Sequence, residues 1–116
     1  MRRPLALLLP FLGFATCGPA PDVPITVTSR APNATFACIA PRLQRLPLRY
    51  DTRATTDGWR MDLQVFAGPP AGWYHNGTIE HSDGVVLYAP DGATTGIFAN
   101  KVSADIAPIL RRCSGR

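Results

Sequence analysis

Apolar and polar residues alternate in several short stretches between Ile25 and Tyr88, as they do in β-strands that bury one face. The clearest stretch runs from Trp59 to Val65, where every second residue is apolar and the intervening residues are polar. Three shorter stretches share the pattern: residues 25–28, 35–39 and 46–50. Pro47 in the last of them favours an edge position or a strand start, because proline cannot donate to a sheet ladder. The alternation therefore predicts a mainly β domain.

Two dipeptides in the second half of the chain predict tight turns. Asn76-Gly77 and Asp83-Gly84 are typical of type I′ hairpin turns, in which both central residues need positive φ. We therefore expect residues 73–88 to form a three-stranded meander.

The end of the chain changes to a helical period. Apolar residues recur there at Val102, Ile106, Leu110 and Cys113. Asp105 can cap such a helix, and Pro108 then lies in its first turn, where the missing N–H does no harm. The predicted fold is a small antiparallel sheet or partly closed barrel with one short C-terminal helix.

Cys38 and Cys113 lie 75 positions apart and match no metal-ligand or redox spacing. In an oxidising compartment they predict one disulfide, which would join the predicted strand 35–39, where Phe36 shares a face with Cys38, to the C-terminal helix. Loop-closure entropy gives such a bond about 4–5 kcal/mol of stabilisation.

The first residues have the layout of a secretory signal. Arg2 and Arg3 supply positive charge, residues 5–14 are mostly apolar, and small residues precede Cys17. We expect a signal peptide at residues 1–16, a Pro-rich tether at 17–24 and the disulfide-linked β-rich domain at 25–116.

A cysteine at this place resembles the lipobox of bacterial lipoproteins, whose first mature residue is a lipid-modified Cys. The resemblance implies an exported periplasmic protein anchored to a membrane through a lipid on Cys17. Gly18 after the cysteine implies the outer membrane. Cleavage after Ala15 is the alternative, and it would leave a secreted chain in which Cys17 is free or forms an intermolecular disulfide.

Charge excludes one class of partner. The chain holds 12 basic and 8 acidic residues, and removal of Arg2 and Arg3 leaves 10 against 8, a net charge of +2. This charge is too small to indicate nucleic-acid binding.

Residues suited to catalysis are few. His75 and His81 are the candidates for a metal or acid–base site, with acidic residues nearby at Asp62, Glu80 and Asp83. A turn at residues 76–77 would point the two histidines to opposite faces of the sheet, so they could not share a metal ion. The sequence also lacks a Gly-x-Ser-x-Gly elbow and a phosphate-binding glycine loop. We expect no catalytic residue, metal or cofactor, and therefore a binding protein.

A strand with Phe36 and Cys38, a Ser82-Asp83-Gly84 loop followed by Tyr88, and Lys101 after Ile97-Phe98 together resemble the membrane-bound inhibitors of c-type lysozyme. By this resemblance Ser82 and Lys101 would enter the lysozyme cleft and pair with its catalytic carboxylates. The alternative is an accessory subunit of an envelope assembly. Its contact surface would include Trp73, Tyr74 and the basic region 42–60.

Overall fold

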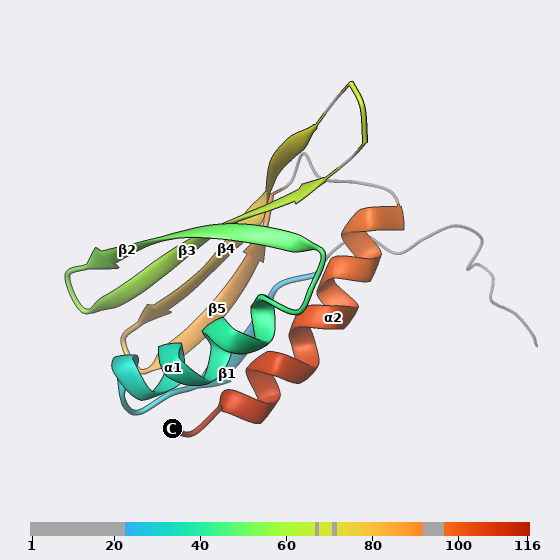
Figure 1. Cartoon of the computed structure of the whole chain (residues 1–116). Helices are drawn as coiled ribbons and strands as arrows, with labels where there is room; N and C mark the ends of the chain where they lie inside the picture. Colours follow the sequence, from blue (N-terminus) through green and yellow to red (C-terminus); the bar gives the residue numbers. More distant parts are fainter. Residues whose placement is uncertain (1–22, 67, 71, 92–96) are drawn as a thin grey trace, which may run out of the picture.

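The computed structural model describes residues 23–66, 68–70, 72–91 and 97–116, with only the backbone for residues 97–101. The elements in chain order are β1 (Ile25–Thr28), α1 (Pro32–Leu43), β2 (Leu48–Thr55), β3 (Gly58–Phe66), β4 (Trp73–Ser82), β5 (Val85–Pro90) and α2 (Ile97–Cys113). The strands form one antiparallel sheet in the order β1-β5-β4-β3-β2. The sheet is open, with β1 and β2 at its edges, and α1 and α2 lie against one face of it (Figure 1). The prediction of a mainly β fold with a C-terminal helix is confirmed.

The core lies between this face and the two helices. From β3 it takes four alternating apolar residues: Trp59, Met61, Leu63 and Val65, each at most 5% exposed. From the helices it takes Ile39, Leu43, Ile106 and Leu110, all fully buried. The alternation in residues 59–65 therefore predicted both the strand and its buried face correctly.

The predicted strand at residues 35–39 is wrong, because these residues lie in α1. Pro32 is in the first turn of this helix, where its fixed φ suits the backbone and its missing N–H costs nothing. The buried residues Thr35, Cys38, Ile39 and Leu43 fall at spacings of three and four. An alternation over only five residues is compatible with both a strand and one face of a helix. The helical spacing of buried residues from Thr35 to Leu43 distinguishes the two.

Asn76 and Gly77 form no turn either, and they lie within the continuous strand β4. Opposite them the register with β3 shifts between Leu63 and Gln64, so that Asn76 is the extra residue of a β-bulge. Asn76 is fully buried, and its Oδ1 accepts a hydrogen bond of 2.9 Å from the hydroxyl of Tyr88. Asn76, a residue type typical of turns, thus has its side chain hydrogen-bonded inside the fold.

Asp83 and Gly84 do form the expected turn between β4 and β5. Their φ angles are 53° and 79°, the positive values that the dipeptide predicted. Because only one of the two predicted turns exists, the expected three-stranded meander over 73–88 is two longer strands.

The C-terminal helix begins earlier than predicted. It starts at Ile97, so Asp105 and Pro108 lie inside it and do not mark its first turn. Pro108 is exposed, so its ring and the lost N–H donor lie on the solvent side of the helix. Of the described helices, none has both the length and the apolar character needed to cross a membrane.

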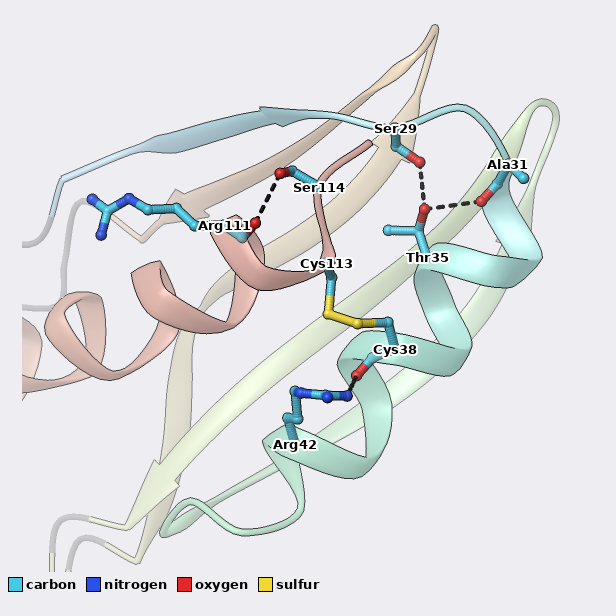
Figure 2. Close-up of a disulfide and its surroundings, with 8 residues drawn as sticks. All are labelled: Ser29, Ala31, Thr35, Cys38, Arg42, Arg111, Cys113 and Ser114. Carbon is cyan, nitrogen blue, oxygen red and sulfur yellow. Dashed lines mark hydrogen bonds between the residues drawn. A yellow bond between two sulfur atoms is a disulfide. The ribbon is translucent and has the colours of Figure 1, made fainter. Parts of the chain in front are cut away.

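Cys38 and Cys113 form the predicted disulfide, with an S–S distance of 2.02 Å. The bond joins α1 to the last residue of α2, and not a strand to a helix as predicted (Figure 2). The backbone beyond it is also held, because the amide of Gly115 donates to the carbonyl of Thr28 at 2.8 Å. The chain end is thereby attached to both α1 and the β1 edge.

Candidate functional site

The sheet face opposite the two helices carries the exposed large apolar side chains of the described sheet, which are Phe66, Trp73 and Leu87. At one end of this outer face, Phe66 and Trp73 are directly paired across β3 and β4. Their ring centroids are 5.5 Å apart, and the side chains are 47% and 39% exposed. The guanidinium carbon of Arg49 lies 4.4 Å from the centre of the Trp73 ring. We call Arg49, Phe66 and Trp73 the aromatic corner.

Hydrogen bonding fixes the arginine of this corner. Arg49 pairs with Gln64 across β2 and β3, and its Nε donates to the Gln64 Oε1 at 2.7 Å. A cation over an exposed aromatic ring contributes about 0.5–1 kcal/mol. Together the two contacts hold the guanidinium over the Trp73 ring, so the corner is formed before any partner arrives.

An apolar pocket of about 310 Å³ adjoins Phe66 on the helix side of the sheet, where its lining includes Leu48, Val65 and residues of α2. Its described lining residues are Leu46, Pro47, Leu48, Val65, Phe66, Val102 and Asp105. Asp105 is the only charged residue among them. The volume is at the small end of ligand pockets and suits one bulky apolar side chain or a short alkyl group. Phe66 belongs to both features and connects the corner to the pocket.

A charged row continues from the corner across the outer face. The Nδ1 of His75 lies 3.1 Å from the Asp91 carboxylate, and its Nε2 lies 3.7 Å from Asp62. Asp62 also pairs with Arg60 at 3.3 Å. Even so, the described residues include no group of three or more His, Cys, Asp or Glu side chains that could hold a metal ion. The row supplies both signs of charge to a polar partner.

His75 and His81 do lie on opposite faces, although for a different reason from the predicted one. Both are in β4, six positions apart, which in a regular strand would place them on the same face. The bulge at Asn76 adds one residue and reverses the alternation. His75 is therefore exposed on the outer face, and His81 is 3% exposed in the core.

The surroundings of His81 include a contact that the sequence did not indicate. Its Nε2 lies 2.9 Å from the hydroxyl oxygen of Ser29, which is also hydrogen-bonded to Thr35 at the start of α1. The two residues are 52 positions apart, and no spacing motif connects them.

This Ser–His pair lacks the rest of a catalytic triad. The Nδ1 of His81 has no hydrogen-bond partner among the described residues, so no acid orients the ring. Ser29 is 5% exposed, and Gly58 packs so closely that a Cβ there would lie 2.9 Å from the His81 Nδ1. The pair fastens β4 to the start of α1, and no substrate can approach it.

The structure does not bring together the two residues that the lysozyme-inhibitor resemblance selects. Ser82 ends β4, where its hydroxyl donates to Asp57 at 3.1 Å, at the end of the sheet that also holds the chain terminus. Lys101 is in the first half of α2, twelve positions before Cys113 and so about 18 Å along the helix axis from that end. Neither residue belongs to the aromatic corner.

The residues of the alternative contact surface are divided between the two faces. Trp73 is exposed in the corner, whereas Tyr74 is half-buried and pairs with Val65 on the helix side. Within the basic region 42–60, Arg49 is in the corner, but Arg42 bonds the Cys38 carbonyl at 2.7 Å in the helix layer. Cys17 and the predicted signal peptide lie outside the described residues.

Comparison of the chain with protein families, curated proteins and solved structures finds no match. The resemblance to lysozyme inhibitors therefore rests on its sequence motifs alone. The aromatic corner is the structural feature that bears on function.

Proposed function

We propose that this chain is an exported bacterial envelope protein, anchored by a lipid on Cys17, whose domain binds a macromolecular partner and catalyses no reaction. The observation that supports this most is the aromatic corner, an exposed Phe66–Trp73 pair held under Arg49 on a sheet face that the helices leave open. Trp and Arg are the residue types that most often dominate protein–protein binding energies.

The geometry of the corner favours a protein partner. Its side chains are already positioned by register and by the Arg49–Gln64 hydrogen bond, so binding costs little side-chain entropy. The adjoining pocket can accept one apolar side chain, and the charged row around His75 can meet polar groups at the rim. This combination of an apolar centre and a polar rim is typical of transient interfaces. An accessory subunit of an envelope assembly would use such a surface.

Site-specific photo-crosslinking in the native host tests the proposal. A photoreactive amino acid replaces Phe66 in the full-length chain, and in a matched control it replaces Leu87. Leu87 is 37% exposed and lies on the same outer face, in β5. We expect one discrete adduct from position 66 and none from position 87. Adding Arg49→Ala and Trp73→Ala should remove the adduct, and thermal unfolding should show that these variants remain folded.

Equal adducts from the two positions, or an adduct that survives both alanine substitutions, would rule out the corner as the contact. Inhibition of a c-type lysozyme is the narrower form of the function and stays a prediction from the resemblance. It requires that Ser82→Ala combined with Lys101→Ala abolish inhibition in a folded protein. The same double variant should leave the adduct from position 66 intact, so the two hypotheses give separate readouts.

A further inference from the structure

The edge of the sheet formed by β2 is exposed on both faces. In the described sheet β2 pairs with β3 alone, so one side of its backbone faces no strand. Four consecutive residues of β2 are exposed: Asp51, Thr52, Arg53 and Ala54. Thr52 and Ala54 point to the helix side, where they oppose the buried Met61 and Trp59, yet no described element covers them. This part of the edge is open to another strand.

The charges on β2 are poorly matched within the chain. Across the β2–β3 ladder, Asp51 lies directly opposite Asp62, and Arg53 lies directly opposite Arg60. Like charges in directly opposed positions destabilise a sheet. Asp62 and Arg60 are paired with each other at 3.3 Å, whereas Asp51 and Arg53 make no ion pair in the part of the chain that the structure describes. The two edge charges are therefore available to an external partner.

We propose that β2 pairs antiparallel with β2 of a second copy of this chain, about a two-fold axis at Thr52. In this register Asp51 of each copy lies opposite Arg53 of the other copy, which creates two attractive pairs on the outer face. Residues 49–55 of the two copies lie opposite one another in this register, which covers seven of the eight residues of β2. The two-fold axis is perpendicular to the sheet, so both copies keep their helices on the same side.

Other registers that preserve the faces are less favourable. Centring the axis on Asp51 would place Asp51 opposite itself and Arg49 opposite Arg53 of the second copy, so that every charged pair would be repulsive. Centring it on Arg53 would place two arginines in contact. Centring it on Tyr50 would bring Pro47 into the paired region and leave the end of β2 unpaired. Charge excludes the registers at Asp51 and Arg53, and Pro47 with the lost pairing excludes the register at Tyr50, which leaves the register at Thr52.

The dimer adds a property to the proposed binding function without depending on it. Each copy contributes its aromatic corner to one continuous outer face, so a partner with two matching sites could bind both corners. Both β1 strands, from which the chain continues toward the N-terminus, lie at the far edges of the joined sheet. Pairing through β2 therefore leaves both β1 strands outside the interface.

Cysteine crosslinking in the native host tests the register. In the full-length chain, Thr52→Cys would place two thiols directly opposite each other, at the Cα separation of about 4.5–5.5 Å that a disulfide accepts. Ala54→Cys is the matched control, since Ala54 is also exposed and lies on the same face of the strand. It would lie about 14 Å from its own copy. We expect a reducible dimer from Thr52→Cys and no more than the unsubstituted background from Ala54→Cys.

Charge reversal supplies a second readout. Asp51→Arg alone turns both attractive pairs into repulsive ones and should raise the dimer dissociation constant, measured by analytical ultracentrifugation of the mature protein, at least about tenfold. Adding Arg53→Asp should restore the original affinity. Within one chain both substitutions relieve a like-charge pair, so loss of the dimer cannot be attributed to unfolding.

Either of two results would overturn the proposal. One is equal crosslinking at positions 52 and 54, or none at either. The other is a failure of the double charge reversal to restore the dimer.

Discussion

Alanine at Gly77 distinguishes the bulge in β4 from the hairpin turn that the sequence predicted. A Cβ at this position would lie 2.5 Å from the carbonyl oxygen of Ala89 and 2.9 Å from the Cα of Pro90. Both are backbone atoms of β5, so neither can rotate away. Relief of the overlap must separate β4 from β5 locally.

Gly84 is the matched comparison, because it does occupy a turn. Its φ is +79°, and the nearest atom to an added Cβ is the carbonyl oxygen of Ser29 at 3.9 Å. Gly84→Ala therefore costs only the strain of a left-handed residue, about 1–2 kcal/mol.

The cost of Gly77→Ala has two contributions. Forced overpacking costs about 1–3 kcal/mol, and each lost ladder hydrogen bond adds about 0.5–1.5 kcal/mol. For two lost ladder bonds we expect a total of about 4 kcal/mol, which is a large fraction of the 5–15 kcal/mol that stabilises a typical domain. A turn at residues 76–77 would instead make the two alanine variants equally costly.

Urea unfolding measures this difference. Fluorescence of the buried Trp59, which is 5% exposed, would report loss of the core. We expect the unfolding midpoint of Gly77→Ala to fall at least 1 M below that of Gly84→Ala. Midpoints that agree within error would refute the argument from the Ala89 contact. A Gly77→Ala chain that does not fold, beside a folded Gly84→Ala chain, would support it.

Two further predictions concern the cysteines. Reduction of the Cys38–Cys113 bond, which closes a separation of 75 residues, should lower the free energy of unfolding by about 4–5 kcal/mol in urea titrations, and a loss below about 1 kcal/mol would contradict this. The intact mass of the protein from its host's membranes should correspond to a lipid-modified chain beginning at Cys17. It should increase by two hydrogens on reduction, whereas a soluble chain beginning at Thr16 would refute the anchor.

The strand and helix predictions succeeded where the apolar pattern was long. Residues 59–65 give four apolar positions on one face, and no helix would bury all four. Residues 35–39 give only two or three apolar positions on one face. Their alternation is also compatible with the buried face of a helix, which here continues to Leu43. Helix α2 was predicted from the spacing of its apolar residues, but its start was placed too late in the chain. Asp105 and Pro108 were taken to mark its first turn, although both can also lie in a helix interior when the proline is exposed.

The Asn-Gly dipeptide shows how tertiary contacts change the meaning of a local signal. Asn76-Gly77 and Asp83-Gly84 have equal turn potential by themselves. The Tyr88 hydroxyl satisfies Asn76 inside the fold, and β5 approaches Gly77 so closely that only glycine fits. Both contacts come from β5, which follows these residues in the chain, so a local pattern could not anticipate them.

The candidate site was predictable only in part. Trp73 and the basic region 42–60 were selected from the sequence, but Phe66 and the particular role of Arg49 were not. Their proximity depends on the register of β2, β3 and β4, which the bulge shifts by one residue. The contact between Ser29 and His81 could not be predicted either, because it joins residues 52 positions apart in the sequence.

Local sequence patterns were sufficient to predict the mainly β class, the central strand with its buried face, the C-terminal helix, the Asp83-Gly84 turn and the cysteine pair. Each of these depends on local periodicity, local backbone preference or a count of residues. Those patterns could not predict that residues 35–39 form a helix, that the disulfide joins two helices, or that one sheet face and the β2 edge stay open. These features depend on which strands become neighbours and in which register, and that is fixed by packing between distant segments.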